Sequence, residues 1–334
     1  MNLFVLKPYS ILFYLTLMSG IFISLSSNNW IGVWLGLELN MYSLIPLLLQ
    51  SNLNQEKEAA VKYFLVQALA SGILMLSMIN INTQISSIIL IISLMMKLGL
   101  APCHFWFPIV MSSLSWHMCW LLSTIQKITP LMLLLNLLTS LNPSIIVLIS
   151  ALSSITGGLG GLNQTQMRAI LAYSSINHLG WMTASTLINL TTTFIYFLSY
   201  IVIVSAVIQT LYLLQYFSSK STLLLDKKSS ILLSISLLSL GGLPPLFGFF
   251  PKFLILYSLL SMQSMFITLS LILIFSSTIS LYYYLKIVFN LNLQQPENNS
   301  MLFTTSLSYN KMLLHSVFLS LSIFSGLFII NCIL

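Results

Sequence analysis

Five ionisable side chains stand inside stretches of sequence that are otherwise too apolar to hold a charge. They are Glu38, Lys97, Lys127, His178 and Lys252. A charge at mid-bilayer costs about 2.5–3.5 kcal/mol on insertion scales, so it persists only where it is paired, hydrated or useful. A carboxylate, three amines and an imidazole in such positions indicate a path for an ion, and a proton is the most economical ion for these groups.

The chemistry of these residue types suits proton transfer. A low-dielectric site favours the neutral form of an amine, and a nearby carboxylate favours the charged form. Glu38 and Lys97 are the preferred pair, with a structural salt bridge as the alternative. For Lys127 the alternative is snorkelling to the membrane surface. His178 is of a type that titrates near neutrality and suits a relay, or it is a hydrogen-bonded core histidine.

Polar residues precede His178 in the sequence. Tyr173, Ser174 and Ser175 supply hydroxyls and Asn177 supplies an amide. They could hold water beside the imidazole, or they could serve to pack helices against one another.

The composition places these residues in a membrane protein. Of the 334 residues, 57% are hydrophobic and only 5% charged, with mean hydropathy +0.98, whereas a soluble protein has about a quarter charged residues. The net charge of +7 comes from scattered basic residues, which favours membrane orientation over nucleic-acid binding. The sequence therefore predicts an all-α, polytopic helix bundle.

Eleven apolar stretches are long enough to cross a bilayer of about 30 Å. Their approximate limits are 9–26, 30–50, 59–80, 85–111, 117–138, 143–163, 168–188, 192–217, 229–260, 264–288 and 312–333. No stretch fits a soluble domain, so residues 1–334 are expected to form a single transmembrane domain. No removable signal is expected at the N-terminus, and the first stretch is expected to be retained as a helix.

Two of these spans are predicted to be broken helices. The fourth contains Gly99 and Pro102, and the ninth contains Gly241, Gly242, Pro244 and Pro245. Proline removes a backbone donor, and a broken helix survives at membrane depth only where protein or water satisfies the freed groups. Paired broken helices mark ion sites in transporters built from inverted repeats; the alternative is a pair of kinks used for packing.

Counting along the helices predicts a common depth for the buried charges. With a rise of 1.5 Å per residue, Glu38 lies ~12 Å deep, Lys97 ~18 Å, and Lys127 and His178 ~15 Å. Lys252 is also mid-span. We therefore expect a row of groups parallel to the membrane.

The basic residues also predict an orientation. If the N-terminus faces one side, that side collects Lys7, Lys57, Lys62, Arg168, Lys220, Lys227, Lys228, Lys286 and Lys311, and the opposite loops hold no lysine or arginine. By the positive-inside rule, this side is the cytoplasm or matrix and the C-terminus lies opposite.

Other chemical motifs are missing from the sequence. Cys103, Cys119 and Cys332 have no metal-ligand or disulfide spacing, so no metal site is expected. The glycine cluster Gly157–Gly161 ends a membrane span, and close helix packing explains it better than phosphate binding.

Several of these motifs together resemble the subunit 2 family of mitochondrial NADH:ubiquinone oxidoreductase, respiratory complex I. The resemblance is carried by Trp34–Asn40, Lys97–Trp106, Gln126–Lys127, Gly160–Arg168, Ala172–Met182, Gly241–Gly248 and Pro251–Lys252. It covers residues from about 30 to 255. One departure is Phe107–Val110, which lacks the acidic residue that relatives often carry shortly after the His-Phe-Trp motif, so an acidic proton-entry group there is in doubt.

The resemblance implies an antiporter-like subunit of the proton-pumping membrane arm, in the shortened animal form, in the mitochondrial inner membrane with its N-terminus in the matrix. Glu38, Lys97, Lys127 and Lys252 would form the central hydrophilic axis with His178 between. The chain would bind no cofactor, while the complex uses FMN, iron–sulfur clusters, NADH and ubiquinone. Expected partners are the antiporter-like subunit 4, the small subunit 4L, accessory subunits and lipids such as cardiolipin.

Two other functions fit the same residues. The chain could be a structural scaffold whose ion pairs lock helices together, or a stand-alone cation/proton antiporter of related build. Glu38→Gln should harm only assembly in a scaffold, and a stand-alone antiporter should not co-purify with NADH-oxidising activity.

Overall fold

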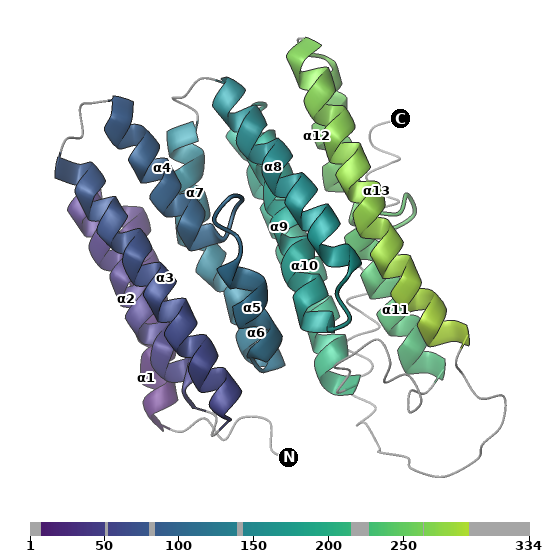
Figure 1. The fold of residues 1–334 in the computed structure, drawn as a ribbon, viewed down its shortest axis with the longest axis horizontal. Helices are drawn as coiled ribbons and strands as arrows, with labels where there is room; N and C mark the ends of the chain where they lie inside the picture. The colour runs from purple at the N-terminus through teal and green to yellow at the C-terminus, as the bar shows by residue number, and fades with distance from the viewer. Residues whose placement is uncertain are drawn as a thin grey trace. The chain divides into compact units, whose positions relative to one another are not determined.

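A computed structural model describes residues 8–50, 53–79, 84–138, 143–214, 227–262 and 264–293. Within them the chain forms thirteen α-helices and no strand (Figure 1). The chain divides into two compact units, residues 1–145 and 146–334. The all-α class predicted from composition is confirmed.

The first unit holds seven helices. They are α1 (Pro8–Ser26), α2 (Trp30–Leu48), α3 (Asn54–Ile79), α4 (Gln84–Leu98), α5 (Trp106–Ser113), α6 (Trp116–Ser123) and α7 (Ile125–Leu138). Helix α2 packs between α1 and α3, and α4 packs against α3 and α7. The residues of α2 that face its neighbours include Glu38 and Asn40, both buried.

The second unit holds the remaining described helices. They are α8 (Pro143–Leu162), α9 (Met167–Ser185), α10 (Leu190–Leu214), α11 (Lys227–Gly241), α12 (Phe249–Leu260) and α13 (Ser264–Leu293). Helix α9 contacts α10, α12 and α13, and nearly all of its residues are buried. A helix enclosed in this way can carry polar side chains, because other helices rather than lipid surround it.

The predicted spans coincide with helices throughout the described residues. Both predicted breaks are present, between α4 and α5 and between α11 and α12. The span predicted over 117–138 consists of two consecutive helices, which meet at Thr124. There both the amide and the hydroxyl bond to the Trp120 carbonyl, an alternative to continuous helical pairing. The predicted span 312–333 lies outside the described residues.

Seven helices among the described residues are long and apolar enough to cross a membrane, counting α6 and α7 together as Trp116–Leu138. Three shorter apolar helices, Ile85–Leu98, Ser230–Gly241 and Phe249–Leu260, are parts of the two broken spans. Helix α9 is not among the seven, and it carries His178, Asn177 and several hydroxyls. The total of eleven spans stays a prediction.

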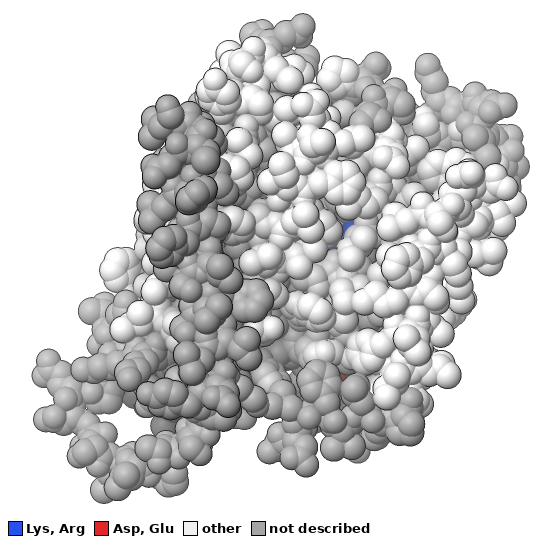
Figure 2. Space-filling model, turned by 180° about the vertical axis from the view of Figure 1, so that it is seen from behind, with Lys and Arg blue, Asp and Glu red and all other residues white. Residues whose placement is uncertain are grey.

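The described surface suits a lipid environment. In the face shown in Figure 2 uncharged side chains dominate, and blue and red atoms are almost absent. Large apolar side chains point outward on several helices, with Phe22 72% and Tyr257 71% exposed. Such exposure would be a liability in water and is expected of a chain that contacts lipid.

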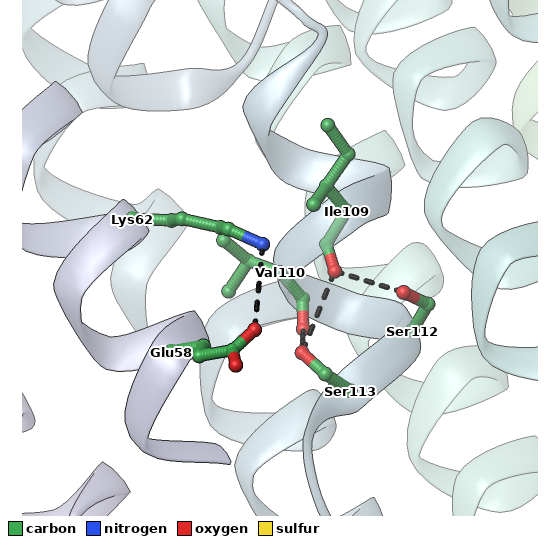
Figure 3. A network of polar contacts seen from close by, with 6 residues as sticks. All are labelled: Glu58, Lys62, Ile109, Val110, Ser112 and Ser113. Carbon is green, nitrogen blue, oxygen red and sulfur yellow. Dashed lines mark hydrogen bonds and ion pairs between the residues drawn. The ribbon is translucent and has the colours of Figure 1, made fainter. Parts of the chain in front are cut away.

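One ion pair lies away from the buried charges. Lys62 and Glu58 on α3 approach to 4.0 Å and are 55% and 71% exposed, as Figure 3 shows beside the end of α5. There Ser112 and Ser113 donate hydrogen bonds of 2.8 and 2.9 Å to carbonyls of their own helix. An exposed pair at this spacing contributes about 0.3–0.5 kcal/mol, so Lys62 is a lysine whose loss should cost little.

The glycines of α8 permit close helix packing, as predicted. A side chain at Gly157 would collide with the backbone of Asn177 on α9, and one at Gly161 would collide with Tyr283 on α13. On the facing side, Gly180 of α9 approaches the backbone of Ser154. Small residues of this kind let membrane helices approach closely, and here they hold α9 in the middle of its unit.

Candidate functional site

The first broken helix ends at Leu98, and side chains satisfy the carbonyls that the break frees. Gly99 follows with φ +73°, a conformation that favours glycine. The Trp106 indole donates to the Met96 carbonyl at 3.0 Å, and the Gln67 amide donates to the Lys97 carbonyl at 3.4 Å. The break is therefore supported by protein on two sides, as a break at membrane depth requires.

This geometry fixes Lys97 in the last turn of α4, inside the first unit. Its side chain is 7% exposed, and the Glu38 side chain on α2 is equally buried. Glu38 is close enough to act electrostatically on Lys97, but among the described residues the two do not form an ion pair within 4.0 Å. Oxygen Oε2 of Glu38 is buried with no hydrogen-bond partner among those residues.

Lys97 and Lys127 open onto one small cavity. Its volume is about 20 Å³, which is room for about one water molecule. The polar residues of its lining are Asn40, Tyr63, Gln67, Lys97, Gln126, Lys127 and Thr129. Thr129 is fully buried, and its hydroxyl has no hydrogen-bond partner among the described residues. The cavity therefore has the polar groups that a bound water needs.

An amide and hydroxyl network forms part of the cavity wall. Gln126 donates to the Asn40 side-chain oxygen at 2.9 Å, and the Tyr63 hydroxyl donates to Gln126 Oε1 at 3.4 Å. These contacts join α2, α3 and α7. Asn40 lies two residues after Glu38, and Gln126 directly precedes Lys127. The network therefore ties together the backbone segments that carry two of the buried ionisable groups.

Lys127 also contacts an aromatic ring. Its Nζ lies 4.9 Å from the centroid of the Phe107 ring, and the Lys127 side chain is 2% exposed. Snorkelling requires the ammonium to reach the membrane surface. A side chain this deeply buried among α2, α4 and α7 residues does not fit that alternative.

The second broken helix holds its lysine in a different way. Helix α11 ends at Gly241, and Gly242 follows with φ +83°. Lys252 Nζ donates a hydrogen bond of 2.9 Å to the Gly241 carbonyl. A cation at the C-terminal end of a helix is favourable because the helix dipole is negative there. The break thus supplies the acceptor that keeps a 6% exposed lysine in place.

Helix α9 brings His178 into the same unit as Lys252. Lys252 Nζ lies 5.8 Å from the ring of Trp181, which is three residues from His178 and so on the same face of α9. His178 Nδ1 and the Tyr196 hydroxyl on α10 are 2.9 Å apart, and the Tyr200 ring lies 5.2 Å from the imidazole.

The hydroxyls predicted to accompany His178 separate into two groups. Ser174 interacts with Tyr284 and Ser175 with Tyr200, so both serines belong to the surroundings of the histidine. The Tyr173 ring instead packs against Gly160 of α8. It serves helix packing, which was the alternative for this group.

The structure thus brings the ionisable residues together in two sets. Glu38, Lys97 and Lys127 lie in the first unit, and His178 and Lys252 lie in the second. All five are buried. Their expected arrangement as one row at a common depth stays a prediction.

Sequence reasoning missed several site residues. Asn40, Gln67 and Gln126 line the cavity, and Tyr196 bonds to His178. The first three had a signal, because side-chain amides are uncommon inside apolar helices. Tyr196 had none, since tyrosine is frequent in this chain. Within the described residues there is no group of three or more histidine, cysteine or acidic side chains that could hold a metal.

Comparison with known proteins shows the family to which the chain belongs. The family described as NADH:quinone oxidoreductase/Mrp antiporter, TM, matches residues 27–280. The NADH-ubiquinone oxidoreductase chain 2 of Locusta migratoria is 40% identical over 331 residues, which is 95% of this chain and 94% of that protein. This chain belongs to the NADH-ubiquinone oxidoreductase chain 2 family. All five buried ionisable residues lie within the matched range.

Further relatives support the family and the fold. The chain 2 protein of Lumbricus terrestris is 42% identical over 295 residues, covering 85% of this chain and 87% of that protein. A chain in the structure of respiratory complex I from Thermus thermophilus with bound aureothin has a TM-score of 0.81 at 24% identity, covering 95% of this chain and 78% of that chain. At that identity the likeness shows the antiporter-like fold alone.

Proposed function

We propose that this chain is a membrane-arm subunit of proton-pumping NADH:ubiquinone oxidoreductase whose buried Glu38, Lys97, Lys127, His178 and Lys252 carry protons through the middle of the membrane. Membership of the chain 2 family supports its place in that enzyme. The observation that carries the proton route is the cavity of about 20 Å³ shared by Lys97 and Lys127. One water there could bridge the two amines.

Electrostatics explains how a distant reaction could drive this route. At an effective dielectric of about 20, a unit charge about 5 Å away contributes about 3 kcal/mol, and this energy changes a protonation ratio by about a hundredfold. A movement of the Glu38 carboxylate away from Lys97 would therefore favour the neutral amine. Quinone reduction elsewhere in the enzyme would start this change, and Lys127 would respond through the shared cavity.

The proposed function also implies a membrane, an orientation and a set of neighbouring subunits for this chain. The protein is a multi-pass protein of the mitochondrial inner membrane, as its animal relatives and apolar helices indicate. We place the N-terminus in the matrix and the C-terminus in the intermembrane space, with both compact units acting as one membrane domain. Its neighbours would be subunits 4 and 4L, accessory subunits and cardiolipin, and FMN and iron–sulfur clusters would be bound elsewhere in the complex.

Replacement of Lys127 by methionine tests the proton route. In the assembled enzyme reconstituted into vesicles, Lys127→Met should lower the number of protons moved per NADH oxidised, because the variant keeps the volume but not the titratable amine. The matched control is Lys62→Met, which removes an exposed lysine of α3 and should leave the ratio unchanged. An unchanged ratio in Lys127→Met would count against a pumping role.

The scaffold alternative makes a different prediction for Glu38. If ion pairs only lock helices, Glu38→Gln should reduce the amount of assembled enzyme while each assembled molecule pumps normally. If Glu38 takes part in proton transfer, the assembled enzyme should show a lowered ratio. Among the described residues Glu38 and Lys97 do not form an ion pair within 4.0 Å, so a locking role gains little support from the geometry.

A further inference from the structure

A tyrosine that the proposed route does not use contacts His178 directly. Tyr196 lies on α10, 1% exposed, and its hydroxyl is 2.9 Å from His178 Nδ1. His178 itself is 8% exposed. Both groups belong to the second unit, on two helices that pack together. The contact is therefore a buried hydrogen bond between two elements.

The partner of Nδ1 decides what a buried histidine can do. An imidazole that gains a proton carries N–H groups at both nitrogens, and each then needs an acceptor. The Tyr196 oxygen can accept from Nδ1–H in the neutral and in the charged state. The hydrogen bond made by one ring nitrogen also determines which nitrogen is protonated and which exchanges a proton. A hydroxyl can either donate to Nδ1 or accept from Nδ1–H, and where it accepts, the proton exchange falls to Nε2.

The surroundings of Tyr196 allow its hydroxyl to act as an acceptor. A hydroxyl that accepts from Nδ1–H must direct its own hydrogen elsewhere. Tyr200 and Tyr284 both lie close enough to Tyr196 to interact with it electrostatically. These tyrosines, with Ser174 and Ser175 beside them, place several oxygen atoms around α9 and α10. The structure therefore offers candidate acceptors near Tyr196, although its hydrogen-bond contact with another side chain is the one to His178 Nδ1.

We propose that Tyr196 is a positioning residue for proton transfer at His178: its oxygen accepts the Nδ1–H bond, supports the protonated imidazole, and leaves Nε2 as the nitrogen that gains and loses the transferred proton. No covalent bond other than N–H at Nε2 forms or breaks. This inference rests on the proposed function, because it requires that His178 takes up a proton during turnover.

The test compares Tyr196→Phe with His178→Gln in the assembled enzyme reconstituted into vesicles. Phenylalanine keeps the ring and removes only the hydroxyl. We expect the number of protons moved per NADH oxidised to fall in Tyr196→Phe toward the value of His178→Gln. The double variant should fall no further than His178→Gln alone, because both changes act on one step. Independent effects that multiply in the double variant would overturn the proposal.

Tyr283→Phe is the matched control. Tyr283 is a buried tyrosine of the same unit, 3% exposed, but its ring packs against Gly161 and Tyr284 instead of His178. Tyr283→Phe should leave the number of protons moved per NADH oxidised unchanged when the yields of assembled enzyme are equal. If His178→Gln lowers the ratio and Tyr196→Phe does not, the role of Tyr196 is overturned while the proposed function stands. If neither these variants nor Lys127→Met lowers the ratio, the proposed function itself fails.

Discussion

At the scale of single residues, this chain keeps each buried amine beside a different kind of partner. Lys97 has a carboxylate at a distance, Lys127 has an aromatic face, and Lys252 has a helix-end carbonyl. Among the described residues, neither Lys97 nor Lys252 forms an ion pair within 4.0 Å. A directly paired lysine would hold its proton firmly, so Lys97 and Lys252 are left able to change their protonation state.

Phe107→Leu should lower the rate of proton uptake at a given rate of NADH oxidation. The change removes the ring that faces the Lys127 ammonium at 4.9 Å. A desolvated cation–π contact is worth about 2 kcal/mol, so the charged amine loses roughly that support. The measurement is the rate of proton uptake into vesicles at a fixed rate of NADH oxidation. Phe253→Leu changes a ring that is 39% exposed on α12, and it should have no such effect.

Gln126→Leu should destabilise the assembled enzyme. It leaves the Asn40 oxygen and the Tyr63 hydroxyl without the partner they have now, at a cost of about 1–3 kcal/mol for a buried group. The midpoint of thermal inactivation of the enzyme should fall. The same change at exposed Gln55 should leave the midpoint where it is, and a stable Gln126→Leu enzyme would mean that the network contributes little.

The identity of the buried charges was accessible from the sequence, and their partners were not. Glu38, Lys97, Lys127, His178 and Lys252 stand out because a charge in an apolar stretch is costly wherever the helix packs. The partners are residues distant in the chain, such as Asn40 for Gln126 and Tyr196 for His178. Their pairing depends on helix rotation and packing, which hydropathy does not encode.

At the scale of elements, the two broken helices share a local design. Each first half ends directly before a glycine with positive φ, and each break carries a lysine nearby. These breaks were predictable, because glycine and proline act on their own backbone within a few residues. How the freed carbonyls are satisfied was not predictable, since the indole, amide and amine that bond to them come from later or separate segments.

Gly242→Ala should disturb the second break and its lysine together. Alanine at this position would have to adopt φ +83°, a backbone conformation that side-chain-bearing residues rarely take, and its Cβ would lie 3.1 Å from Lys252 Nζ. Strain of this kind costs on the order of 1–3 kcal/mol, and Lys252 would be displaced from the Gly241 carbonyl. Enzyme yield and proton ratio should both fall.

Gly72→Ala is the control for that variant. Gly72 lies inside α3 with nothing within 4 Å of an added Cβ, so alanine should be neutral or stabilise the helix by up to about 1 kcal/mol. If Gly242→Ala behaves like Gly72→Ala, the break does not depend on the backbone conformation of that glycine.

At the scale of the whole molecule, the orientation of the chain is open to a direct test. A single cysteine introduced in place of Lys57 or Gln166 should react with a membrane-impermeant thiol reagent only from the matrix side. A single cysteine in place of Asn28 or Asn189 should react only from the other side. All four positions are exposed at helix ends. The three native cysteines would first be replaced by serine. A mixed pattern would disprove the alternating topology, and the reverse pattern would invert the orientation.

The small size of the cavity between Lys97 and Lys127 also bears on energy conservation. Each elementary charge that returns across the membrane dissipates about 2.3 kcal/mol per 100 mV, so a permanently continuous file of water would short-circuit the gradient. A chamber of about 20 Å³ holds about one water and cannot form such a file. The proposed transfer between the two amines therefore needs one bridging water and no standing water path across the membrane.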